Sequence, residues 1–107
     1  MTRGQVLRLI WIDAFVEEKQ FVMRRAHIEL AFDISTPQAS LDLRLFMRLF
    51  PGRLVYDKSE KGYRADAAVQ SPFTADERAA ALLAGAAAAR AHARIDAAME
   101  GKDENGH

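Results

Sequence analysis

The basic residues of this chain gather in its middle, where their chemistry would be the binding of phosphates and base edges. The 107 residues carry 15 Lys and Arg against 15 Asp and Glu, but residues 37–64 alone carry six basic residues against three acidic ones. Guanidinium groups pair with phosphate and, bidentately, with guanine. This local excess predicts contact with nucleic acid, although a neutral chain neutralises fewer phosphates than a strongly basic one.

Residues 36–50 place several of these groups on one side of an expected helix. Apolar side chains take more than half of its circumference, on a wheel of about 100° per residue. The remaining arc holds Thr36, Pro37, Ser40, Arg44, Met47 and Arg48. We expect Arg44 to pair with guanine, Thr36 and Ser40 to touch bases or phosphate, and Arg48 to contact the backbone. Two arginines on a solvated helix face are ordinary when taken alone.

A short basic hairpin is expected directly after that helix and strengthens the DNA-binding interpretation. Pro51 and Gly52 stop the helix, and apolar residues at 54–56 and 63 flank a polar loop at 57–62. Four basic residues lie on or near this hairpin, namely Arg53, Lys58, Lys61 and Arg64. A hairpin in this place can act as a wing that touches the flanking backbone or the minor groove. For Tyr56 and Tyr63, packing onto the core is favoured over stacking on bases.

The elements that must hold this unit can be predicted from apolar spacing and capping residues. Residues 4–18 and 24–32 repeat apolar side chains at helical spacing, with a short strand at Phe21-Val22 between them. Ser35 and Gln38 stand at capping-box spacing and start the third helix at Thr36. The order helix, strand, helix, turn, helix, hairpin predicts a winged helix-turn-helix domain over residues 1–73. The fold class is mainly α with a small β-hairpin.

The remaining residues predict a long helix with a separate role. Thr74 and Glu77 repeat the capping-box spacing, and an alanine-rich helix follows to about Met99, although Gly85 costs about 1 kcal/mol in its middle. Small side chains form one narrow stripe along it: Leu82, Ala86, Ala89, Ala93 and Ala97. We expect residues 74–100 to dimerise through this stripe, while covering the core of the same chain is the alternative. Residues 101–107 are expected to be disordered.

Composition argues against other classes of protein. The chain has no cysteine, so no disulfide or thiolate metal site can form, and a reducing, cytoplasmic location is expected. The N-terminal apolar stretch is too short and too charged for a signal peptide or membrane span. No catalytic constellation, phosphate loop or cofactor motif is visible, so neither an enzyme nor a cofactor or metal is expected. His27 has no second ligand at metal spacing, and a surface or phosphate-facing role is favoured for it.

Several positions between residues 32 and 63 also resemble a known family. They are Phe32-Asp33-Ile34-Ser35, Gln38 through Leu43, Pro51, Leu54, Tyr56-Asp57, Lys61 and Tyr63. They resemble the N-terminal winged-helix domain of WYL-domain transcriptional repressors, including those associated with bacterial phage defence, and more distantly DeoR-type regulators. The resemblance covers about residues 5–73. Those repressors continue into ligand-sensing and dimerisation domains, whereas this sequence ends after one helix, so the resemblance does not by itself imply effector sensing by that route.

The resemblance implies a homodimeric repressor that binds an inverted repeat in double-stranded DNA. The residues that it carries over are Ser35, Thr36, Gln38, Ser40 and Arg44, with Lys58 and Lys61 in the wing. The alternative function is a protein-interaction module, in which the apolar arc at Leu41, Leu45 and Leu49 binds a partner, for example in a truncated regulator that forms heterodimers.

Overall fold

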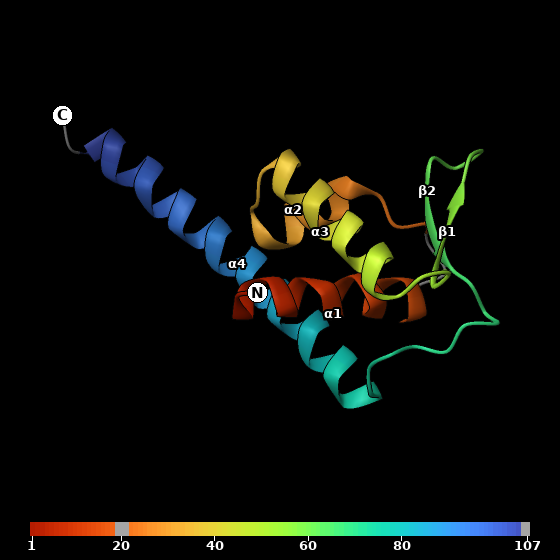
Figure 1. Cartoon of the computed structure of the whole chain (residues 1–107). Helices are drawn as coiled ribbons and strands as arrows, with labels where there is room; N and C mark the ends of the chain where they lie inside the picture. Colours follow the sequence, from red (N-terminus) through yellow and green to blue (C-terminus); the bar gives the residue numbers. More distant parts are fainter. Residues whose placement is uncertain (19–21, 106–107) are drawn as a thin grey trace.

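Three short helices, a hairpin and one long helix follow one another in the computed structural model, which describes residues 1–18 and 22–105 (Figure 1). The elements are α1 (Arg3–Glu18), α2 (Arg25–Phe32), α3 (Thr36–Leu49), β1 (Leu54–Asp57), β2 (Gly62–Ala65) and α4 (Ala75–Asn105). In Figure 1, α4 crosses α1 and also reaches α2, α2 and α3 lie together on one side of α1, and the hairpin stands at the end of α3. The predicted fold class, a winged helix-turn-helix with a long C-terminal helix, is confirmed.

The core forms where α1 meets α2, α3 and the first turns of α4. Its fully enclosed side chains include Ile12, Ile28 and Phe46, each from a different helix. Burying a side chain of this size stabilises a fold by roughly 1.5–3 kcal/mol, so this junction dominates the apolar stabilisation. The core therefore fixes the second and third helices relative to the first.

Only one of the two hydrogen bonds of the capping box predicted at the start of α3 is formed. Ser35 Oγ accepts a hydrogen bond from the backbone N–H of Gln38 at 3.2 Å, which satisfies one of the free amides of the first turn. The Gln38 side chain does not return to Ser35. It donates instead to Asp42 at 2.9 Å, because that buried carboxylate needs donors. At the start of α4, Thr74 and Glu77 form both halves of the predicted box, at 3.1 and 2.8 Å.

The hairpin is antiparallel and rests on the segment before α2. Tyr56 is opposite Tyr63 in its register, and Tyr63 also exchanges two backbone hydrogen bonds with Met23, at 2.8 and 2.9 Å. This bridge lies one residue beyond the strand predicted at Phe21-Val22, of which Phe21 is outside the described residues. A Cβ at Gly62 would lie 2.0 Å from Cγ1 of Val22, so only glycine allows this close approach.

The first half of α4 packs on α1 and α2, His92 still lies 2.9 Å from Asp33 at the end of α2, and the C-terminal end of α4 projects away from the other helices (Figure 1). A Cβ at Gly85 would lie 2.7 Å from Nε1 of Trp11, so this glycine permits the helix contact that compensates for its poor helix propensity. Farther along, Ile95 and Met99 are 58% and 60% exposed. No helix among the described residues has both the length and the apolar character that crossing a bilayer requires.

The end of α4 corrects one prediction. Residues 101–105, expected to be disordered, continue the helix, while 106–107 lie outside the described residues. The alanine-rich run upstream supplies a long hydrogen-bonded helix, and adding further residues to an existing helix is easier than starting one. A single glycine at 101 is therefore insufficient to stop it.

Candidate nucleic-acid interface

A cleft of about 520 Å³ separates α2 and α3 from the hairpin. Four of the side chains that line it are cationic, namely Arg24, Arg25, Arg44 and Lys61. Uncharged polar and aromatic groups complete it, with Ser40, Tyr56 and Tyr63 among them, and Glu29 is the carboxylate in its lining. This concentration of positive charge in a concave surface attracts polyanions and raises their local concentration.

The exposed face of α3 forms one wall of this cleft. Thr36, Ser40 and Arg44 follow one another at intervals of four residues, so they lie in one row. Arg25 donates from its guanidinium to Ser40 Oγ at 3.2 Å, and Thr36 donates from its hydroxyl to Glu29 at 2.6 Å. Three further predicted residues, Ser35, Pro37 and Arg48, are exposed at this surface or beside it. Of the recognition residues predicted in and before α3, Ser40 and Arg44 line the cleft, while Thr36 lies in the same row outside its lining and Gln38 points to Asp42.

The wing contributes Lys61 and the two tyrosines to the opposite wall. Lys61 has a positive φ of 55° at the end of the loop, which turns the chain into β2. Tyr63 packs against the core as expected, but Tyr56 is 51% exposed and lines the cleft, so the prediction of core packing was wrong for it. The two rings contact edge to face, with centroids 5.1 Å apart. Tyr63 therefore holds Tyr56 at the cleft surface.

Lys58 and Arg64 lie away from the cleft on the other face of the hairpin. Both line a shallow hollow formed by residues 55–58 and 64–67, since alternate residues of a strand point to opposite faces. Arg64 is paired with Asp57 at 3.0 Å. The backbone N–H of Glu60, the Ser59 hydroxyl and Arg64 lower the pKa of Asp57 well below its ordinary value. The wing's basic residues are therefore divided between two faces.

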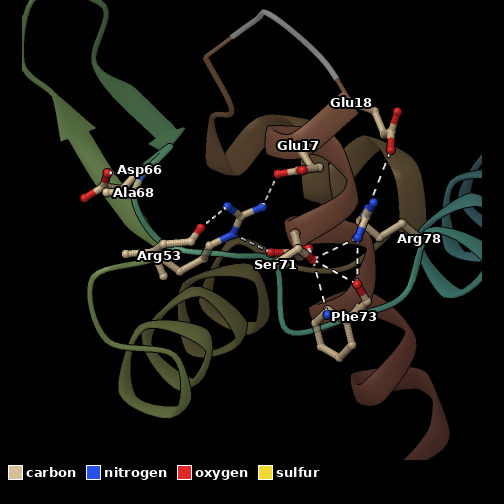
Figure 2. A network of polar contacts seen from close by, with 10 residues as sticks. Glu17, Glu18, Arg53, Asp66, Ala68, Ser71, Phe73 and Arg78 are labelled. Atoms are coloured by element: carbon tan, nitrogen blue, oxygen red, sulfur yellow. Dashed lines mark hydrogen bonds and ion pairs between the residues drawn. The ribbon is translucent and has the colours of Figure 1, made fainter.

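Arg53 was predicted to belong to the interface, but the structure buries it. Its side chain is only 2% exposed, because Gly52, with φ of 82°, turns the chain back toward α1. The guanidinium donates to Asp13 at 2.7 Å, to Glu17 at 2.5 Å and to the backbone oxygen of Val69 at 2.8 Å. Figure 2 shows Arg53 turned inward with its guanidinium against Glu17. A side chain enclosed in this way is not available to DNA.

Burial of Arg53 is compensated by this set of partners. Burial alone would lower the pKa of Arg53, but hydrogen bonds and charge from Glu17 and Asp13 outweigh it and raise the pKa. Reciprocally, the hydrogen bond from Arg53 lowers the pKa of Glu17. Ser71 also donates to Asp13, and Arg78 of α4 donates to Ser71 at 3.1 Å (Figure 2). One ionic network thus joins the base of the wing to α1 and α4.

A second buried carboxylate, Asp42, fixes α3 against α1. Arg8 donates to it at 2.6 Å, and Gln5 and Gln38 donate to its Oδ1 at 3.2 and 2.9 Å. Asp42 is fully buried, so these donors replace the water that its charge has lost. Gln38 was expected in the interface from the family resemblance. Its side chain is instead committed to this anchor.

Two basic residues of the cleft, Arg24 and Arg25, were not predicted from the sequence. Arg24 donates to the backbone oxygen of Glu60 at 2.8 Å and lies 3.6 Å from its carboxylate, so it links α2 to the wing. Arg25 connects α2 to Ser40 of α3. A basic pair at the start of the helix before the recognition helix was the available signal, since that helix crosses the DNA backbone in helix-turn-helix proteins.

His27, expected at the surface, is half-buried beside that pair. Its ring stacks on Phe15 with centroids 4.9 Å apart, and its Nδ1 accepts a hydrogen bond from the backbone N–H of Arg24 at 2.8 Å. Burial, and then the charge of Arg24, lower the pKa of His27. The ring is therefore a neutral structural group. Within residues 1–18 and 22–105, no cluster of three or more His, Asp or Glu suits a metal ion.

The predicted dimerisation stripe occupies two environments. Leu82, Ala86 and Ala89 line an apolar groove together with Trp11, Phe15, Leu30 and Ala31, whereas Ala93 is exposed on the second half of α4. Leu30 is 76% exposed at the edge of this groove. Ala81 and Gly85 of the same helix cover the core of their own chain, as the alternative to dimerisation expected.

The fold and its cationic cleft define a winged helix-turn-helix domain of the kind that binds DNA. Residues 5–84 match the family model of the BrxR transcriptional regulator winged helix-turn-helix domain, and the chain belongs to this family. BrxR is a WYL-associated family of phage-defence regulators, so the resemblance seen in the sequence is confirmed for the winged-helix domain. The family consists of transcriptional regulators rather than enzymes. A search of curated proteins found no match.

Proposed function

We propose that this chain is a sequence-specific repressor that acts in the bacterial cytoplasm and binds an inverted-repeat operator as a homodimer. In this proposal α3 enters the major groove and the wing contacts the flanking backbone. The single observation that carries it is the cleft that gathers Arg24, Arg25, Arg44 and Lys61 between α3 and the wing. A neutral chain with this distribution binds DNA through one face only.

The arrangement suits the dimensions of duplex DNA. The major groove is about 12 Å wide and admits one helix, whose N-terminal residues reach base edges. Thr36, Ser40 and Arg44 face outward there, and Arg44 has no protein partner among the described residues. It is free to form a bidentate pair with guanine, while Arg25 and Lys61 on either side are placed for phosphates.

A homodimer would double the cationic surface and read two half-sites. Half-sites on one face of DNA lie about one helical turn or a multiple of it apart. The stripe of Leu82, Ala86, Ala89 and Ala93 supports this proposal, because part of it already borders an apolar groove and the rest is exposed. We expect Ala89→Glu to reduce the molecular mass measured by sedimentation to that of a monomer. Ala87→Glu, placed on another face of α4, is the matched control.

A mobility-shift titration tests the DNA proposal. The probe is the DNA upstream of the protein's own gene, with random competitor, at about 50 and about 200 mM salt. We expect a specific shift that weakens steeply with salt and falls at least about tenfold in Arg44→Ala. Arg90→Ala removes an exposed charge from α4 and should change little. A folded protein that prefers no sequence would refute the proposal.

A protein-interaction module is the second candidate, and one observation favours it. Leu41 and Leu49 are 50% and 45% exposed on α3, with Leu45 half-buried between them, where the sequence had indicated a buried or interfacial arc. In this case Leu41→Glu would abolish capture of the partner and Arg44→Ala would not. Under the DNA proposal, Arg44→Ala would weaken binding to the operator and Leu41→Glu would not.

A further inference from the structure

Glu29 is a carboxylate within a cleft whose charge is otherwise positive. It extends from α2 toward the N-terminus of α3, and both of its oxygens face a partner. Oε1 accepts the hydrogen bond from Thr36 Oγ1 at 2.6 Å, and Oε2 lies 3.7 Å from Nε of Arg25. Its side chain is 27% exposed. A negative group here weakens the attraction of phosphates, so its place calls for another explanation.

A chain of contacts runs from Glu29 to two hydroxyls of the recognition helix. Arg25 contacts Glu29 with Nε and donates from its terminal nitrogen to Ser40 Oγ at 3.2 Å. Glu29 in turn receives the hydrogen bond of Thr36. Thr36 and Ser40, one helical turn apart on the exposed row of α3, are therefore tied to the same pair on α2.

The chemistry of these partners gives the two hydroxyls opposite polarity. A carboxylate only accepts hydrogen bonds, so Thr36 must give its proton to Glu29 and can present only lone pairs to a ligand at the exposed face of α3. A guanidinium only donates, so Ser40 must accept from Arg25 and keeps its own proton. Among the described residues no acceptor takes that proton. The bond to Glu29 is charge-assisted, roughly twice as strong as a neutral one, and holds Thr36 in this state.

We infer that Glu29 is a specificity-determining residue, which makes Thr36 an obligatory acceptor and so selects a base with an exocyclic amino group. This inference rests on the proposed DNA-binding function. In the major groove the amino donors are N6 of adenine and N4 of cytosine, whereas guanine and thymine present acceptors. Thr36 then repels guanine and thymine at its position. Ser40, a donor, takes an acceptor such as N7 or O6 of guanine or O4 of thymine.

Selection of binding sites from a random duplex library tests the assignment. The full chain, Thr36→Val, Glu29→Ala and Glu60→Ala are each carried through the selection, after circular dichroism has shown that they fold. The position read by Thr36 is the one whose base preference disappears in Thr36→Val, which keeps the shape and removes the hydroxyl. We expect adenine or cytosine there by about fivefold over guanine and thymine, the value of one hydrogen bond.

The two variants that remove a carboxylate, Glu29→Ala and Glu60→Ala, separate the effect of hydrogen-bond polarity from the effect of charge. Both remove one negative charge from the DNA-facing surface, and Glu60 on the wing contacts Arg24 rather than Thr36. Both should bind duplexes more tightly in general, but only Glu29→Ala should lose the preference at the Thr36 position, because its freed hydroxyl can donate as well as accept. Guanine or thymine at that position, or an unchanged preference in Glu29→Ala, would overturn the inference while DNA binding stands. A parent protein that enriches no sequence would remove the DNA proposal itself.

Discussion

Two arginines of this chain, Arg53 and Arg44, lie in opposite environments, one in the interior and one in the cleft. Both belong to the basic segment at residues 37–64. Arg53 is 2% exposed and engages Asp13 and Glu17, whereas Arg44 is exposed and lines the cleft. The interior arginine places surfaces relative to one another, and the cleft arginine is part of the proposed DNA-binding surface.

The difference shows why the interior ions are present. Replacing a buried ion pair by apolar residues is often neutral or stabilising, so such pairs are weak contributors to net stability. Their value here is positional: the Arg53 network fixes the wing's base to α1, and the Asp42 network fixes α3 to α1. The spacing between recognition helix and wing follows from these two anchors.

The largest effect is expected for Arg53→Ala. The change leaves Asp13 buried and charged without its main donor, which costs about 3–5 kcal/mol of unfolding free energy. Urea denaturation followed by circular dichroism measures the loss. The control Arg48→Ala, on the exposed face of α3, should stay within about 0.5 kcal/mol. An Arg53→Ala protein with full stability and weakened DNA binding would place Arg53 in the interface after all.

A smaller loss is expected for Asp42→Ala. Three donors, from Arg8, Gln5 and Gln38, lose their common acceptor, but Arg8 and Gln5 are near enough to the surface to reach water. We expect a loss of about 2 kcal/mol, the value of hydrogen bonds to a charged group. The same urea titration applies, with Asp76→Ala in the exposed first turn of α4 as control. Equal losses in the two variants would argue against Asp42 as an anchor.

Arg25→Ala should leave the fold intact and affect only binding. Its ion pair with Glu29 is partly exposed and contributes little to stability. If Arg25 contacts a phosphate, the variant weakens binding to all duplexes alike and lowers the slope of log affinity against log salt by about one. Fluorescence anisotropy at several salt concentrations measures this slope. An unchanged slope would assign Arg25 to positioning Ser40 alone.

The smallest effect concerns the pH dependence of stability through His27. Because its pKa in the folded chain lies below the unfolded value of 6.5, the unfolded chain binds more protons between these two pKa values. The stabilisation of the fold by neutral His27 is therefore complete above pH 6.5 and is lost as pH falls through the pKa of His27 in the folded chain. The midpoint temperature of thermal unfolding should therefore be lower at about pH 5.5 than at about pH 7.5, and this difference should be smaller in His27→Gln. Equal decreases in both proteins would contradict the assignment.

The sequence predicted the scaffold well because its signals are local. Ser35 and Thr74 cap helices through residues three positions away. The stop at Pro51-Gly52 and the apolar residues of the two strands are also signals within a few residues of the elements that they define. The candidate site was predicted only in part. Thr36, Ser40 and Arg44 follow from the periodicity of one helix, but Arg24 and Arg25 belong to another helix whose placement depends on packing.

The sequence by itself determined which segments become helix or hairpin and which face of α3 is polar, since both follow from backbone propensity and side-chain period. Only the tertiary structure decided that Arg53 is buried while Arg44 is exposed, that Gln38 serves Asp42, and that Glu29 holds Thr36. The physical reason is the same in each case. A charged or polar side chain is directed by the partner that replaces its water, and these partners come from elements distant in sequence.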